Sequence, residues 1–170
     1  MIPVISVVGK SDVGKTTLLE KLIRELKSRG YKVATVKHDV HGFDIDVPGK
    51  DTWRHAQAGS DVVVISSPAK LAMISRTEEE LSLDEVCARV TGVDLIITEG
   101  YKRANKPKIE VFRRGVYDEL LCAPEELIAL ATDVEFDLGV PCYGLDDAAG
   151  LVDRIESLFL HSRERIASPK

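Results

Sequence analysis

Apolar residues follow two different patterns, and segments with one pattern alternate along the chain with segments that have the other. The first is a run of consecutive apolar residues, such as residues 2–8, and it predicts a buried strand. The second repeats every three or four positions, as at Leu19, Leu22 and Leu26, and it predicts a helix. Further apolar runs cover residues 31–36, 61–66, 70–75, 94–99, 109–112, 127–132 and 142–145. Strands that alternate with helices predict an α/β fold of three layers, in which helices flank a mostly parallel sheet.

Two of the apolar runs depart from this alternation. Only a short turn containing Pro68 separates residues 61–66 from residues 70–75, so we expect an antiparallel hairpin on an edge of the sheet. Between the run 31–36 and a short helix expected over residues 52–58, a polar stretch covers residues 38–50. A connection of this length inside a domain is usually functional or disordered.

The first predicted strand leads into the sequence GKSDVGKT at residues 9–16, which fits the phosphate-loop pattern G-x-x-x-x-G-K-S/T. Its two glycines let the backbone curl so that successive N–H groups point inward, and the helix that follows adds unpaired N–H donors. Such a loop binds the phosphates of a nucleotide. We therefore expect one P-loop nucleotide-binding domain over residues 1–165, with a flexible tail over residues 166–170.

The residues expected to contact the nucleotide are the loop and its immediate successor: Gly9, Lys10, Ser11, Asp12, Val13, Gly14, Lys15, Thr16 and Thr17. In P-loop enzymes the lysine binds the β- and γ-phosphates, and the hydroxyl that follows it binds Mg²⁺. Glu99 ends the apolar run 94–99, where such enzymes hold the acidic residue that fixes Mg²⁺ or the attacking water. Lys15 and Glu99 are thus the candidate catalytic residues.

Candidate Mg²⁺ ligands also occur outside the loop and Glu99. Asp44 or Asp46 is one, because the stretch 38–50 leaves the carboxyl end of a strand next to the phosphate loop. His38 and His41 form either a transition-metal site or polar surface.

Asp133 directly follows the apolar run 127–132. An aspartate at the end of a late strand can accept hydrogen bonds from the N1–H and exocyclic amine of guanine, and adenine offers no matching donors. The usual guanine motif NKxD is represented here only by its last member. Asp133 is therefore a candidate base-binding residue, and an aspartate that caps a turn or helix is the alternative.

Composition and charge narrow the class of protein. The net charge of −5 over 170 residues provides no basic face for nucleic acid. No apolar run is long enough to span a bilayer, and no leader sequence precedes the first strand, so we expect a soluble cytoplasmic protein. The three cysteines lack the spacing of a zinc site or a disulfide framework. The chain has one cluster of basic residues, which is either a phosphate-binding segment or a solvated turn: Lys102, Arg103, Lys106 and Lys108.

These motifs together resemble one known family, the molybdopterin-guanine dinucleotide biosynthesis adapter proteins, MobB. The resemblance extends over most of residues 2–135 and is carried by residues 9–18, 37–38, 41, 43–59, 94–102 and 131–133. The phosphate loop belongs to a vast superfamily, whereas the stretch 43–59 is close to diagnostic.

The resemblance implies a GTP-binding protein with weak GTPase activity. Its partner would be the nucleotidyltransferase that attaches GMP to molybdopterin, with other molybdopterin-handling enzymes as further candidates. By position, Lys15 and Thr16 would bind phosphate and Mg²⁺, Asp44 and Glu99 would act at the metal or water, and Asp133 would read the base.

The family resemblance also implies a homodimer. The dimer would form a continuous sheet between subunits, for which the run 70–75 is a candidate. Lys10 matches the extra lysine with which related dimeric ATPases reach their partner subunit.

Three other functions remain open from the sequence. A small-molecule kinase would use Asp44 or His41 to activate a substrate hydroxyl, but the chain lacks an arginine-rich lid. A metal-insertion GTPase would use His38 and His41 as ligands. A nucleotide-dependent scaffold would need no hydrolysis.

Overall fold

A computed structural model of the chain describes residues 1–160. Their contacts divide them into two compact units, residues 1–38 with 87–160, and residues 39–86. The single domain expected over residues 1–165 stays a prediction. The tail expected at residues 166–170 lies outside the described residues.

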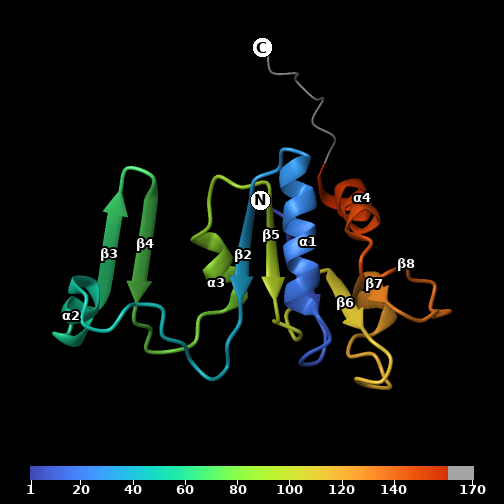
Figure 1. Cartoon of the computed structure of the whole chain (residues 1–170), viewed down its shortest axis with the longest axis horizontal. Helices are drawn as coiled ribbons and strands as arrows, with labels where there is room; N and C mark the ends of the chain where they lie inside the picture. Colours follow the sequence, from blue (N-terminus) through green and yellow to red (C-terminus); the bar gives the residue numbers. More distant parts are fainter. Residues whose placement is uncertain (161–170) are drawn as a thin grey trace, which may run out of the picture. The chain divides into compact units, whose positions relative to one another are not determined.

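The first unit is built on a sheet of six strands: β1 (Val4–Val8), β2 (Val33–Lys37), β5 (Leu95–Glu99), β6 (Lys108–Phe112), β7 (Leu127–Thr132) and β8 (Cys142–Tyr143). They lie in the order β2-β5-β1-β6-β7-β8, and every pairing is parallel (Figure 1). The α/β fold with a mostly parallel sheet is thus confirmed. Because the strands are parallel, all six carboxyl ends meet at one edge, where ligands bind in sheets of this kind.

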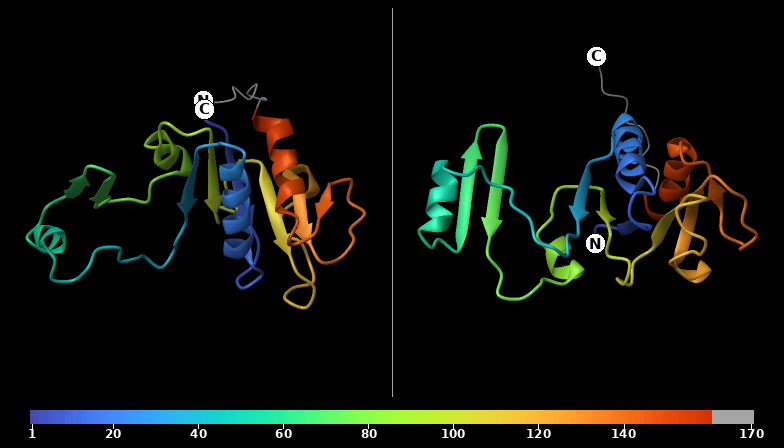
Figure 2. Two further views of the ribbon diagram at one scale, coloured as in Figure 1. Left: turned by 45° about the horizontal axis from the view of Figure 1, so that its top comes forward. Right: turned by 60° about the horizontal axis from the view of Figure 1, so that its bottom comes forward.

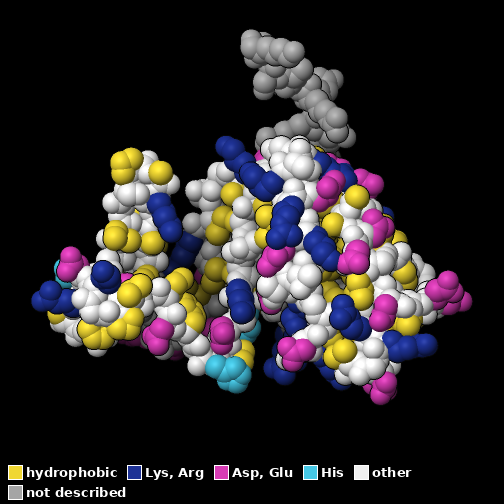
Figure 3. Space-filling view, in the orientation of Figure 1, with side chains coloured by type: hydrophobic (Ala, Val, Ile, Leu, Met, Phe, Trp, Pro, Cys, Tyr) yellow, Lys and Arg dark blue, Asp and Glu magenta, His cyan; other side chains and the backbone are white. Residues whose placement is uncertain are grey.

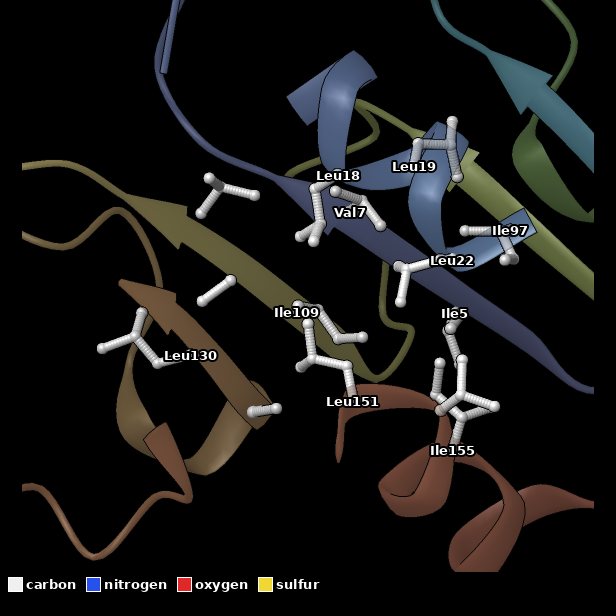
Figure 4. Packing of buried hydrophobic residues seen from close by; sticks show 14 of the residues in the cluster. Ile5, Val7, Leu18, Leu19, Leu22, Ile97, Ile109, Leu130, Leu151 and Ile155 are labelled. Atoms are coloured by element: carbon white, nitrogen blue, oxygen red, sulfur yellow. The ribbon is translucent and has the colours of Figure 1, made fainter. Parts of the chain in front are cut away.

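Helices α1 (Lys15–Ser28) and α4 (Ala148–Phe159) pack together on one face of this sheet (Figures 1 and 2). The buried side of α1 is a stripe of four leucines, Leu18, Leu19, Leu22 and Leu26. On α4, Leu151 and Ile155 are fully buried, with Leu151 beside Ile109 of β6 and Ile155 on the side of Ile5 of β1 (Figure 4). Leu158 of the same helix is 40% exposed.

Two short helices precede strands of the first unit. Helix α3 (Leu83–Ala88) begins with a capping box, in which the Glu85 carboxylate accepts hydrogen bonds from the Ser82 backbone N–H and hydroxyl. A 3₁₀ turn (Pro124–Glu126) leads into β7. No helix among residues 1–160 has the length and apolar character needed to cross a membrane.

The second unit consists of helix α2 (Asp51–Gln57) and a hairpin of β3 (Val62–Ser67) and β4 (Lys70–Ser75). The hairpin is antiparallel as predicted, with Val64 opposite Met73. The prediction that it would join an edge of the main sheet is wrong within this chain, because β3 and β4 form a separate two-stranded sheet. Helix α2 begins at Asp51, one residue before the predicted start, and extended Lys50 holds the cap position.

One face of the hairpin is apolar and exposed. Side chains of alternate strand residues point to the same face, and on this face four of them are about half exposed or more: Val62, Val64, Leu71 and Met73. Figure 3 shows hydrophobic side chains on the surface of the hairpin. In β3 and β4 together, Val63 is the one apolar residue that is buried.

Candidate functional site: the phosphate loop and the strand ends beside it

The phosphate loop connects β1 to α1 and has a backbone that needs its glycines. Gly9 has φ +151°, and a Cβ there would lie 2.7 Å from the Val111 carbonyl oxygen. Gly14 has φ +100° and takes the cap position of α1 in a left-handed conformation. Asp12 is also left-handed, with φ +62°. Side chains larger than hydrogen at the two glycines would distort the curl that turns the N–H groups inward.

The first turn of α1 is arranged to bind an anion. No side chain caps the helix, and its first turn contains no acidic residue. Its N–H groups and the positive end of its dipole are therefore available to a phosphate group. The Lys15 ammonium donates a hydrogen bond to the Lys10 carbonyl oxygen at 2.6 Å, so it lies folded over the loop.

The structure brings together two of the predicted Mg²⁺ residues. The Thr16 hydroxyl donates a hydrogen bond to Glu99 Oε1 at 2.9 Å. Glu99 comes from β5, the neighbour of β1, in which Val7 is its register partner. A hydroxyl and a carboxylate at this distance are the oxygen ligands that Mg²⁺ prefers. The residues present thus fit the metal, although their sequence positions are 83 residues apart.

Of the other metal candidates, His38 lies beside Glu99, because its backbone N–H donates a hydrogen bond to the Glu99 carbonyl oxygen at 3.0 Å. Asp44 belongs to the second unit, so its role as a Mg²⁺ ligand stays a prediction. Within that unit, Asp46 Oδ1 accepts hydrogen bonds from the Val47 N–H and the Thr52 hydroxyl. His38 stacks on Tyr101 with ring centres 4.5 Å apart. Over residues 1–160, no group of three or more His, Cys, Asp or Glu side chains is arranged to hold a metal ion.

Asp133 stands at the carboxyl end of β7, beside a hollow of about 310 Å³. The ends of β7 and β8 line this hollow with Thr132, Asp133, Val134, Glu135, Cys142, Tyr143 and Gly144. The Arg114 N–H donates a hydrogen bond to Asp133 Oδ1 at 2.9 Å, which fixes the carboxylate. The carboxyl end of β7, which carries the predicted base-binding residue, therefore forms part of the lining of the hollow.

Lys10 makes its contact within its own chain. Its ammonium nitrogen lies 4.9 Å from the centre of the Tyr117 ring, within the range of a cation–π interaction. The Tyr117 hydroxyl is held by the Val111 carbonyl and by the buried Glu110 carboxylate. Burial and then this carboxylate raise the pKa of Tyr117 above its usual range, so the ring remains neutral.

Two basic residues differ from their expected places. Lys108, grouped with the exposed basic cluster, is 1% exposed and pairs with Glu126 at 2.6 Å, so it is unavailable to a ligand. Arg113 was missed: its Nη2 lies 3.8 Å from where a Cβ on Gly14 would stand. The available signal was its position directly after the strand at residues 109–112.

Comparisons with known proteins identify the family of this chain. A family model described as molybdopterin guanine dinucleotide synthesis protein B, MobB, matches residues 4–133. The chain is 38% identical over 159 residues to the molybdopterin-guanine dinucleotide biosynthesis adapter protein of Escherichia coli K12, covering 90% of this chain and 91% of that one. It is 34% identical over 162 residues to the adapter protein of Haemophilus influenzae, covering 94% and 91%.

Solved structures give the same result. A crystal structure of molybdopterin-guanine biosynthesis protein B superposes with a TM-score of 0.73 at 34% identity, covering 92% of this chain and 98% of that one. The structure of MobB from Bacillus subtilis shares the fold, with a TM-score of 0.70 at 23% identity over 90% and 98% of the two chains. The chain described here belongs to the MobB family, as its phosphate loop and its stretch 43–59 indicated.

Proposed function

We propose that this protein is a GTP-binding adapter in the synthesis of molybdopterin guanine dinucleotide, with Mg²⁺ as cofactor and slow hydrolysis of GTP. The names of its relatives support the pathway. One observation supports the nucleotide: the phosphate loop and Asp133 lie at the same edge of one sheet, with the hollow beside Asp133. The cytoplasmic location expected from the sequence stays a prediction.

The phosphate end of the site would be formed by the loop, Lys15 and the start of α1. Lys15 needs to leave the Lys10 carbonyl and contact the phosphates, where its charge is better compensated. Thr16 and Glu99 would hold the metal between them, which requires the present hydrogen bond to open. Bound Mg²⁺ supplies neutralisation of the charge on the β- and γ-phosphates.

The base end would be formed by Asp133. Its Oδ1 accepts one hydrogen bond from Arg114, and each carboxylate oxygen can accept about two, so capacity remains for two donors from guanine. Adenine presents an acceptor at N1, which would face the carboxylate unfavourably. Asp133 would therefore select GTP over ATP.

Hydrolysis by the isolated protein should be slow. Glu99 is the proposed group for positioning the attacking water, but the same carboxylate is also proposed to hold the metal with Thr16. Unassisted P-loop switch proteins turn over far below about 1 s⁻¹. A turnover number above that value would contradict the adapter and favour an enzyme such as a kinase.

The test is a titration of GTP and ATP, each with and without Mg²⁺, against the wild type and Asp133→Asn. We expect tighter binding of GTP, and a loss of about tenfold or more in GTP affinity with Asp133→Asn, because the amide replaces one acceptor by a donor. Asp137→Asn is the matched control, since this exposed carboxyl lies outside the hollow. Preferential ATP binding by the wild type would reject the assignment of Asp133.

We also propose that the exposed face of the hairpin contacts a second copy of the chain. Four half-exposed apolar side chains on two short strands are costly to leave in water, and within residues 1–160 the hairpin pairs with no further strand. Either a packed face or a continuous sheet between copies would satisfy them.

Light scattering after size exclusion tests the dimer. The wild type should have the mass of two chains, and the double variant Val64→Glu with Met73→Glu should have the mass of one. Leu158→Glu places the same charge on an exposed leucine of α4 and should leave the mass unchanged. A monomeric wild type would reject the dimer while leaving the nucleotide site untouched.

A partner assay tests the adapter role. The nucleotidyltransferase named in the proposed pathway is mixed with wild type or Lys15→Ala in the presence of GTP and Mg²⁺, and complex formation is measured by analytical ultracentrifugation. We expect a complex with the wild type. No complex under any nucleotide condition would reject this partner.

A further inference from the structure

The turn that follows β6 contacts both ends of the proposed nucleotide site. It contains Arg113 and Arg114, and it closes with a hydrogen bond from the Val116 N–H to the Arg113 carbonyl oxygen at 3.2 Å. Gly115 has φ +83°, which a side chain would strain, so the turn is sharp and well defined. Two successive residues therefore take fixed directions from the end of β6.

The first of these residues reaches the phosphate loop. Arg113 Nη2 lies 3.8 Å from where a Cβ on Gly14 would stand, so the guanidinium group lies beside the loop residue that precedes Lys15. The side chain is exposed to solvent. Its charge is thus placed next to the helix start that binds an anion.

The second residue holds Asp133. The Arg114 N–H donates to Asp133 Oδ1 at 2.9 Å. One turn thus fixes the carboxylate proposed to bind the base and carries a cation beside the phosphate loop. Because adjacent residues make these two contacts, the distance between them is set by the backbone of the turn.

The charges around Arg113 leave its guanidinium available. Asp146, at the start of α4, forms an ion pair with Lys21 of α1. Lys21 lowers the pKa of Asp146 most, and Arg113 contributes a smaller attraction, so Asp146 is primarily the partner of Lys21. The other cations of the loop are engaged, Lys10 with Tyr117 and Lys15 with a carbonyl oxygen.

Strand order indicates which part of the nucleotide passes Arg113. Strand β6 lies between β1, which carries the phosphate loop, and β7, which carries Asp133. A nucleotide that joins these two sites must cross the end of β6. Glu99, on β5, lies on the opposite side of β1 and marks the end where the γ-phosphate and metal would lie.

We propose that Arg113 binds the nucleotide at the phosphates nearest the nucleoside, and that the turn of residues 113–116 sets the distance between base and phosphate recognition. This rests on the nucleotide site proposed above. Arginine suits the role because its planar group can bind two phosphate oxygens at once. Arg113 thus acts within its own chain, on the opposite side of the loop from Glu99.

The test is a titration of GDP and GTP against wild type, Arg113→Ala, Arg113→Lys and Arg89→Ala. We expect Arg113→Ala to weaken both nucleotides by about the same factor, roughly tenfold, because both carry the inner phosphates. Arg113→Lys should recover part of the loss. The slope of affinity against salt concentration should also fall in Arg113→Ala. Arg89→Ala, an exposed arginine next to α3, is the matched control and should bind as the wild type does.

Each other outcome is decisive. Equal affinities for Arg113→Ala and Arg89→Ala would overturn the proposal. A loss confined to GTP would move Arg113 to the γ-phosphate and overturn the assignment to the inner phosphates. If ligand-free Arg113→Ala melts at a lower temperature than Arg89→Ala, the affinities of the wild type and Arg113→Lys are compared instead, because lysine keeps the charge. Full wild-type affinity of Arg113→Lys, with an unchanged ratio of GDP to GTP affinity, would overturn the need for arginine.

The two proposals fail separately. A wild type that binds no guanine nucleotide would reject the proposed GTP site. If it binds adenine nucleotides instead, the same variants titrated with ADP and ATP still decide the role of Arg113.

Discussion

The sheet of the first unit and the hairpin of the second are built from similar apolar strands, yet their side chains differ in burial. Ile5 and Ile97 of the sheet are fully buried, whereas Leu71 and Met73 of the hairpin are 67% and 58% exposed. Each central strand of the sheet has a neighbouring strand on both sides, and helices α1 and α4 pack on one face of the sheet. A strand pair with one short helix cannot bury both of its faces. Burial thus depends on the neighbours a strand acquires rather than on its own sequence.

The largest effect that sharpens this comparison is the loss of a core side chain. Leu22→Ala should lower the free energy of unfolding by about 3 kcal/mol, because Leu22 is fully buried between α1 and the sheet. Met73→Ala should cost less than about 0.5 kcal/mol at low protein concentration. Urea denaturation measures both.

Protein concentration separates the two units further. The cost of Leu22→Ala should be the same at every concentration, whereas the cost of Met73→Ala should rise with concentration if the hairpin face is covered by a second copy. A large, concentration-independent cost for Met73→Ala would show that the hairpin face is covered within the chain, and would break the comparison.

Much of the first unit was predictable because its signals are local. The strand at residues 127–132 and the helix that follows the loop at residues 9–16 each depend on neighbouring residues, and both are confirmed. The carboxylate at Glu99 was predicted from the end of an apolar run, and parallel pairing with β1 brings it to Thr16.

What the sequence did not provide depends on contacts between distant residues. Lys108 was expected in a basic surface cluster, but β6 is covered on both faces and Lys108 is buried against Glu126. Arg113 and Gly14 are 99 positions apart, so their proximity follows only from the pairing of β6 with β1. The separate hairpin was missed because an apolar run predicts a strand but not the sheet that the strand joins.

The second prediction tests whether the Mg²⁺ that assists nucleotide binding is held by residues of the first unit alone. Thr16→Ala should lower the Mg²⁺-dependent affinity for GTP about tenfold, because the hydroxyl proposed to bind the metal is lost. Titration with GTP in the presence of Mg²⁺ or EDTA measures this. Wild-type and variant affinities should converge in EDTA. Equal Mg²⁺ dependence in both would remove Thr16 from the metal site.

Asp44→Asn, measured in the same titration, tests the second unit. A reduced response to Mg²⁺ would support Asp44 as a ligand contributed by that unit. An unchanged response would remove Asp44 from the metal site.

The third prediction concerns a buried charged residue of the first unit. Strands β3 and β4 of the hairpin contain no buried charged residue. Glu126→Gln should lower the free energy of unfolding by about 1 kcal/mol, because the Lys108 ammonium group loses its charged partner. The cost is reduced because the Glu126 side chain is 46% exposed and water replaces part of the interaction. Glu125→Gln, one residue earlier, is the control and should have no measurable cost in urea denaturation. Equal effects of the two variants would mean that Lys108 is satisfied without Glu126.

The same pair gives the smallest effect, a dependence on pH. The hydrogen bond from Lys108, followed by that from the Ala123 N–H, lowers the pKa of Glu126 below its usual value of 4.5. A carboxyl group with a lowered folded-state pKa stabilises the fold fully above its unfolded-state pKa, and this contribution is lost as the pH falls through the folded-state value. The difference in unfolding free energy between wild type and Glu126→Gln should therefore be constant above about pH 5.5 and shrink toward pH 3. Urea denaturation across this range measures it. A difference that grows on acidification would mean that the carboxyl is better satisfied when protonated, and the buried lysine would then need another partner.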